Sequence, residues 1–121
     1  MRRLTSVAAV AFTVVLHADF AAGHAVLVSS IPGAGAVLKE APREIRLSFS
    51  APVEARFSKL TVTSREGKKV EVGPISSDPQ DKKNFAASVP ILPPGYYQVH
   101  WETTSSDSHR IQGQFEFEIR P

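Results

Sequence analysis

The strongest constraint on the fold is the alternation of apolar and polar residues in the last quarter of the chain. Over residues 97–102, Tyr97, Val99 and Trp101 alternate with polar neighbours, and over residues 111–119 every second residue is apolar or glycine. Successive side chains of a β-strand point to opposite faces, so the pattern predicts two strands that each bury one face. Such strands need a second layer to cover their apolar faces.

Shorter segments with similar patterns, separated by turn residues, occupy the rest of the chain. The expected strands cover residues 25–29, 43–50, 57–64, 68–72, 84–89, 97–102 and 111–119. We expect a loop over residues 73–83, because this segment carries two prolines, two serines and two aspartates. No segment shows helical periodicity of useful length. About seven short strands predict an all-β domain, an antiparallel sandwich of two sheets in the manner of immunoglobulin-like domains.

The first 23 residues have the pattern of a secretory signal peptide. Arg2 and Arg3 precede an apolar stretch over residues 7–16, and residues 21–23 supply the small side chains that a signal peptidase requires. We expect cleavage after Gly23, export, and a mature domain of residues 24–121. No apolar run after the signal approaches the ~20 residues needed to cross a bilayer.

Cleavage at this position would make His24 the first residue of the mature protein. An N-terminal histidine offers a metal ion two nitrogens, the free α-amine and imidazole Nδ1, in one six-membered chelate. A histidine inside the chain cannot do so, because its backbone nitrogen is an amide. Ligation requires a neutral imidazole and a deprotonated amine, so metal affinity is expected to fall as the pH drops through the imidazole range.

Two further ligand types, Asp107 and His109, stand two positions apart in the segment 105–109, which reads Ser-Ser-Asp-Ser-His. If the local chain is extended, both side chains project to the same side and reach one ion. With His24 they make three nitrogens and one oxygen, which suit a tetragonal Cu(II) ion, whereas zinc prefers a tetrahedral site. The alternative is a solvated aspartate beside a surface histidine, since this pattern is common in loops.

The part of the chain after residue 23 has no cysteine and no methionine, because the single methionine is Met1. A thioether-rich Cu(I) site is therefore excluded from the mature domain. Loss of Arg2, Arg3 and Asp19 with the signal leaves a net charge of +1. This balance does not indicate a nucleic-acid partner, which would need clustered basic residues on one face.

Several stretches form, in this order and spacing, the pattern of a known family. They are HAVL at 24–27, SIPGAG at 30–35, AP at 41–42 leading into LSFS at 47–50, LPPGYYQVHW at 92–101, SSDSH at 105–109 and GQFEF at 113–117. Over essentially all of the mature chain, the sequence resembles the CopC family of periplasmic copper-binding proteins.

The resemblance implies a Greek-key β-sandwich of the immunoglobulin-like or cupredoxin-like type. It implies one Cu(II) ion per chain with His24, Asp107 and His109 as ligands, a location in the periplasm, and a membrane partner of the CopD type. We expect a monomer. The function implied is that of a copper carrier or buffer in copper homeostasis or resistance, and not of an enzyme.

Two departures from the family pattern refine this expectation. Some members carry a loop rich in Met and His that binds Cu(I), whereas residues 64–79 contain neither, which favours a variant that binds Cu(II) alone. Some members place a glutamate after the Phe-Ser of the second main strand, where this chain has Ala51; the nearby Glu54 is not assigned a role. His100 is expected to be a solvent-facing strand residue, with a secondary metal contact as the alternative.

Two other functions are consistent with parts of the pattern. An N-terminal histidine chelate with a second histidine is also the copper brace of polysaccharide monooxygenases, but an acidic ligand such as Asp107 would stabilise Cu(II) and hinder reduction. The chain is also short for a flat polysaccharide-binding face. The third possibility is an immunoglobulin-like interaction module without a metal. No motif marks a nucleophile, so a hydrolase is not indicated.

Overall fold

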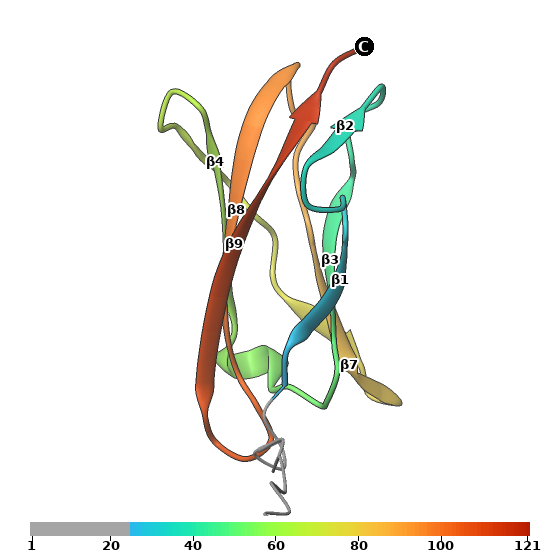
Figure 1. The fold of residues 1–121 in the computed structure, drawn as a ribbon, viewed down its shortest axis with the longest axis vertical. Helices are drawn as coiled ribbons and strands as arrows, with labels where there is room; N and C mark the ends of the chain where they lie inside the picture. The colour runs from blue at the N-terminus through green and yellow to red at the C-terminus, as the bar shows by residue number, and fades with distance from the viewer. Residues whose placement is uncertain (1–24) are drawn as a thin grey trace, which may run out of the picture.

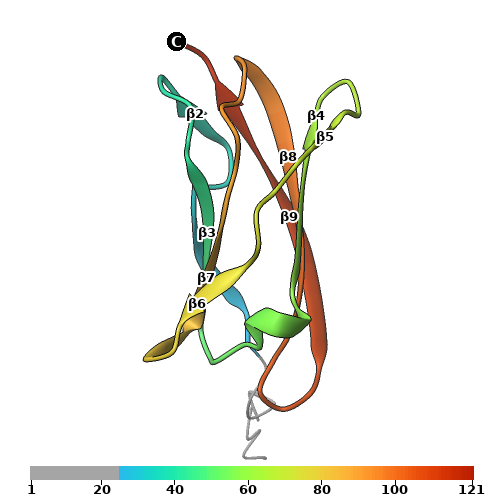
Figure 2. The same ribbon diagram turned by 180° about the vertical axis from the view of Figure 1, so that it is seen from behind.

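Two β-sheets face each other across an apolar core in the computed structural model, which describes residues 25–121 (Figure 1). One sheet has the strand order β1-β3-β7-β6, and the other has the order β2-β9-β8-β4-β5. Seen from behind, β6 and β7 lie in one layer and β4, β5 and β8 in the other (Figure 2). The elements are β1 (Leu27–Ile31), β2 (Ala36–Leu38), β3 (Glu44–Phe49), the 3-10 turn η1 (Ala55–Phe57), β4 (Lys59–Ser64), β5 (Lys69–Val70), β6 (Ser76–Asp78), β7 (Asp81–Ser88), β8 (Gly95–Thr104) and β9 (Arg110–Ile119). The predicted all-β sandwich is confirmed.

The two longest strands, β8 and β9, pair over their full length. Their antiparallel register runs from Gly95 opposite Ile119 to Thr104 opposite Arg110. Every strand pair among the described residues is antiparallel except β2 with β9, which is parallel. The predicted alternation is observed, since the apolar side chains of β8 and β9 point into the core.

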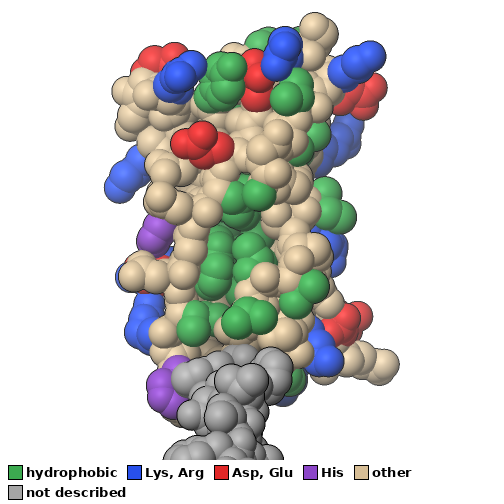
Figure 3. Space-filling view, viewed as in Figure 1, with side chains coloured by type: hydrophobic (Ala, Val, Ile, Leu, Met, Phe, Trp, Pro, Cys, Tyr) green, Lys and Arg blue, Asp and Glu red, His purple; other side chains and the backbone are tan. Residues whose placement is uncertain are grey.

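The core is closed by aromatic side chains from both sheets. Phe49 of β3 meets Trp101 of β8 edge-on at a ring-centroid distance of 5.2 Å, and also packs against Phe85 of β7 at 5.4 Å. A Cβ on Gly113 of β9 would lie only 2.6 Å from Cζ2 of the Trp101 indole, so the indole occupies the space that glycine leaves. Figure 3 shows hydrophobic side chains at the surface along the edge between the two layers.

Three local expectations were wrong. Residues 73–83 are not one loop, because they contain β6 and the start of β7. The strand β2 was not predicted, and the strand expected from residue 57 begins only at Lys59, after η1. β2 consists of three apolar residues and β6 of three polar ones, so neither shows apolar-polar alternation in the sequence. Each forms beside a longer strand that offers its backbone donors and acceptors.

The start of the described chain and the loop between β8 and β9 lie at the same end of the sandwich, the lower end in Figure 1. Ala25 is buried in the core with 2% of its surface exposed, and Val26 exchanges backbone and side-chain hydrogen bonds with Ser50. A few residues further on, Val53 forms a β-bridge with Ser105, the first residue of the loop. The segment after β3 therefore contacts both the start of the described chain, through Ser50, and the loop between β8 and β9, through Val53. The described residues contain no helix that is long and apolar enough to cross a membrane.

Candidate metal centre

Asp107 and His109 lie side by side in the loop between β8 and β9. Nδ1 of His109 is 3.0 Å from Oδ2 of Asp107, and the imidazole is well exposed, with 62% of the side-chain surface accessible against 21% for the carboxylate. Two donor atoms that each lie about 2 Å from one ion, at about 90°, are about 2.8 Å apart. The observed separation therefore fits two neighbouring ligands of one metal ion.

The local chain that brings them together is a turn, whereas the sequence pattern suggested their proximity only for an extended segment. The amide of Ser108 donates to the carbonyl of Ser105 over 2.9 Å, and the amide of Ser105 donates to the carbonyl of His109 over 2.9 Å. Ser108 has a φ of 71°, in the left-handed region that residues other than glycine rarely adopt. The two side chains thus meet because the backbone reverses between them, and not through strand alternation.

The carboxylate of Asp107 is held by hydrogen bonds on its other oxygen. The hydroxyl of Ser105 donates to Oδ1, and the amide of His109 donates to the same oxygen over 3.3 Å. The hydrogen bond from Ser105 is the main cause that lowers the pKa of Asp107 to about 2, with His109 adding to the effect. Asp107 is therefore an anion at neutral pH and needs to release no proton to bind a cation.

The third predicted ligand, His24, lies outside the described residues. The chain that follows it is fixed at the end of the sandwich that carries the loop between β8 and β9, because Ala25 is buried and Val26 is hydrogen-bonded to Ser50. Within residues 25–121, no group of three or more His, Cys, Asp or Glu side chains gathers in one place. The described part of the chain thus supplies two candidate ligands, and a complete site needs donors from elsewhere.

The two other residues considered for a metal role lie in different places. His100 is half-buried on the outer face of β8, opposite Thr61 and Gln114. It lies four residues before the end of β8 at Thr104, which corresponds to about 13 Å along the strand. The amide of Glu54 donates to the carbonyl of Thr104 over 2.9 Å, so its backbone lies beside the end of β8. Of the two, only Glu54 is near the loop.

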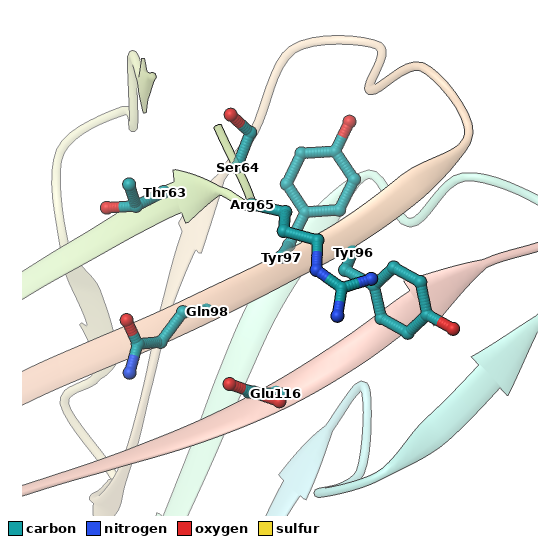
Figure 4. Close-up of a pocket in the computed structure, with 7 residues that line it drawn as sticks. All are labelled: Thr63, Ser64, Arg65, Tyr96, Tyr97, Gln98 and Glu116. Atoms are coloured by element: carbon teal, nitrogen blue, oxygen red, sulfur yellow. The ribbon is translucent and has the colours of Figure 1, made fainter. Parts of the chain in front are cut away.

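A cleft at the opposite end of the sandwich is chemically different. Its cavity has a volume of about 250 Å³, and the guanidinium carbon of Arg65 lies 4.5 Å from the centre of the Tyr96 ring (Figure 4). The other lining residues are Thr63, Ser64, Tyr97, Gln98 and Glu116. Tyr97 is a structural residue here, since its hydroxyl donates to the carbonyl of Pro93 over 2.6 Å, in the manner of a tyrosine corner. No histidine lines this cleft.

Comparisons with known proteins show which family and which solved structures the chain resembles. The CopC domain family matches residues 27–120, from β1 to one residue past β9. Protein YobA of Escherichia coli (strain K12) is 34% identical over 100 residues, which are 80% of this chain and 79% of YobA. Copper resistance protein C of Escherichia coli is 34% identical over 110 residues, 83% of this chain and 84% of that protein. The crystal structure of CopC from Methylosinus trichosporium OB3b has a TM-score of 0.78 at 28% identity, and the match covers 81% of this chain and 95% of that one.

Proposed function

Because the chain belongs to the CopC family, we propose that it is an exported copper-binding protein that acts as a carrier or buffer in copper homeostasis or resistance. One of the relatives, copper resistance protein C of Escherichia coli, is a resistance protein by name, and the family places the chain among binding proteins and not among enzymes. The single observation that carries the proposal for this chain is the pair Asp107 and His109, with Nδ1 and Oδ2 3.0 Å apart.

The proposed site contains His24, Asp107 and His109. Signal cleavage after Gly23 would supply the α-amine and the imidazole of His24, so that one ion has three nitrogens and one carboxylate oxygen. The geometry supports this set because His24 is two residues from Val26, a reach of at most about 7 Å. Val26 is itself bonded to Ser50 at the end of the sandwich that carries the loop.

Cu(II) is the proposed cargo, with one ion per chain. Imidazole, amine and carboxylate donors suit Cu(II), whereas Cu(I) prefers thiolate and thioether ligands. Residues 24–121 contain neither cysteine nor methionine. The same composition supports a variant of the family that holds Cu(II) alone. We further propose a monomer in the periplasm that exchanges copper with a membrane partner of the CopD type.

The test compares two purified forms of the protein, one that begins at His24 and one that retains Gly23 before it. Each is titrated with Cu(II) and followed by electron paramagnetic resonance. We expect the first form to bind one equivalent in a tetragonal site with three nitrogens and one oxygen, and the second to bind much more weakly. Equal binding would show that the amine is not a ligand. If neither form binds, an immunoglobulin-like interaction module is the better description.

The copper-brace alternative has its own measurement. The bound copper is treated with ascorbate, and peroxide is measured on re-oxidation. An anionic ligand in the copper plane stabilises the higher charge of Cu(II), so we expect slow reduction and little peroxide. Rapid cycling between the two oxidation states would favour an oxidative enzyme over a carrier.

A further inference from the structure

The inward-facing side chains of β8 change from apolar to polar near its end, close to the loop of residues 105–109 that carries Asp107 and His109 (the metal loop). Val99 and Trp101 are apolar, but the next two inward positions carry hydroxyls, Thr103 with 0% and Ser105 with 1% of the surface exposed. A buried hydroxyl costs free energy unless it is hydrogen-bonded. The hydroxyl of Thr103 shares a hydrogen bond with that of Ser58 at 2.6 Å. The hydroxyl of Ser105 is bonded to the carboxylate of Asp107.

The backbone of Ser105 is fixed from several directions. It forms the bridge to Val53, its amide donates to the carbonyl of His109, and its carbonyl accepts from the amide of Ser108. Its hydroxyl has one proton and two acceptors within reach, Oδ1 of Asp107 and, at 3.1 Å, the carbonyl of His109. A carboxylate is the stronger acceptor, so the proton goes to Asp107.

The two carboxylate oxygens therefore have different surroundings. Oδ1 accepts from the Ser105 hydroxyl and from the His109 amide, whereas Oδ2 faces Nδ1 of the His109 imidazole. We propose that Ser105 is a positioning residue of the copper site: it holds Oδ1 so that Oδ2 alone is presented to the ion beside the imidazole of His109. This inference rests on the proposed function, because it assumes that Asp107 is a ligand.

The physical consequence is a carboxylate that is oriented before the ion arrives. Without the buried hydroxyl, the Asp107 side chain can rotate and present either oxygen or both, and this freedom must be lost on binding. Groups that orient a metal ligand typically contribute 10–100-fold to metal affinity. Ser105 is well placed for this role because it is buried and its backbone is bridged to Val53 in the segment after β3.

The experiment uses the mature protein and two variants that each remove one buried hydroxyl, one near the end of β8 and one directly after it. Ser105→Ala removes the hydroxyl bonded to Asp107, and Thr103→Val removes the hydroxyl bonded to Ser58 while keeping the side-chain shape. We expect Ser105→Ala to weaken Cu(II) binding 10–100-fold and to change the hyperfine coupling of the resonance spectrum. Thr103→Val is expected to lower the melting temperature but to leave affinity within about twofold and the spectrum unchanged.

A second pair keeps the test informative if the small alanine side chain prevents folding. Threonine and valine at position 105 have nearly the same side-chain shape, but only threonine keeps the hydroxyl. We therefore expect tight Cu(II) binding and the parent spectrum for Ser105→Thr and not for Ser105→Val. If all Ser105 variants bind within about twofold of the parent, or if Thr103→Val weakens binding as much as Ser105→Ala does, the positioning role is wrong.

The same titration of Asp107→Ala separates this failure from failure of the proposed function. If Asp107→Ala abolishes tight binding while Ser105→Ala does not weaken it, the site is correct and the positioning role is wrong. If Asp107→Ala binds Cu(II) as the parent does, Asp107 is not a ligand and both proposals fail.

Discussion

Val26 and Ser50 are joined by two hydrogen bonds: the Val26 amide donates to Oγ of Ser50 over 3.0 Å, and the Ser50 amide donates to the Val26 carbonyl over 2.9 Å. This pair holds the start of the described chain at the end of β3. Since the segment after β3 also bridges to Ser105, the pair links the first strand to the metal loop.

Ser50→Ala removes the acceptor for the Val26 amide and leaves the second hydrogen bond in place. We expect a loss of ~1 kcal/mol in the free energy of unfolding, and a Cu(II) affinity about fivefold lower because Val26 is held less firmly at the end of the sandwich that carries the loop between β8 and β9. Chemical denaturation and Cu(II) titration measure the two effects. Ser76→Ala, on the remote strand β6, is the control; an equal loss of affinity there would contradict the anchoring role.

His109→Ala and His100→Ala distinguish the two histidines of β8 and the metal loop. His109 lies 3.0 Å from Asp107, whereas His100 is on the outer face of β8 in the middle of the sheet. We expect at least a tenfold loss of Cu(II) affinity for His109→Ala and a change below twofold for His100→Ala, measured by competition with a chelator. A large loss for His100→Ala would assign it the secondary contact left open by the sequence.

Asp107 should make the stability of the metal-free protein depend on pH at the acidic end. Hydrogen bonding from Ser105 lowers its pKa to about 2 in the folded state, from 3.8. Its contribution is therefore fully present above the unfolded value of 3.8 and is lost as the pH falls through about 2. The parent should be more stable than Asp107→Asn at pH 5, and the difference should shrink towards pH 2 in urea unfolding. A constant difference would show that the charge of Asp107 is not involved.

Ser108 adopts a backbone conformation that favours glycine, with a φ of 71°. Ser108→Gly is expected to keep Cu(II) binding and to raise or preserve the melting temperature, because it removes the left-handed penalty of about 1–2 kcal/mol. Ser108→Val should lower both the Cu(II) affinity and the melting temperature, since a β-branched side chain disfavours the left-handed conformation. Ser106→Val in the same loop is the control. Equal effects of valine at the two positions would argue against a special backbone at Ser108.

Gly113→Ala tests the packing of the indole in the core. The added Cβ would lie 2.6 Å from Cζ2 of Trp101, so either the backbone of β9 or the indole must shift. We expect this shift to lower the free energy of unfolding by about 1–3 kcal/mol. We expect a lower melting temperature and an altered Trp101 emission spectrum. Gly33→Ala is the control, because its nearest atom would be 3.9 Å away. Unchanged fluorescence in Gly113→Ala would show that the indole does not fill this space.

Strand alternation predicted the long strands correctly because their side chains divide between core and solvent. β3, β8 and β9 each bury one face completely enough to leave a period of two in the sequence. β2 and β6 leave no such period, since they are three residues long and are stabilised by backbone pairing with β9 and β7. Elements of this kind depend on a partner strand that is distant in sequence.

For the candidate site, residue type and spacing pointed to Asp107 and His109 on the condition that the local chain is extended. The structure brings the two side chains together in another way, through a turn with Ser108 in the left-handed region. Ser105 was missed entirely. A serine two residues before an aspartate is common, and only its burial of 99% and its hydrogen bond to Asp107 distinguish it from other serines.

Local patterns were enough to predict the fold class and to limit the candidate metal donors, because alternation and the lack of cysteine and methionine can be read one residue at a time. Which residues meet depends on the packing of the two sheets. Val26 reaches Ser50, and Val53 reaches Ser105, across separations of 24 and 52 positions. Contacts of this length follow from how the two sheets pack, since a local sequence pattern carries no information about which distant backbone will supply its hydrogen-bond partner.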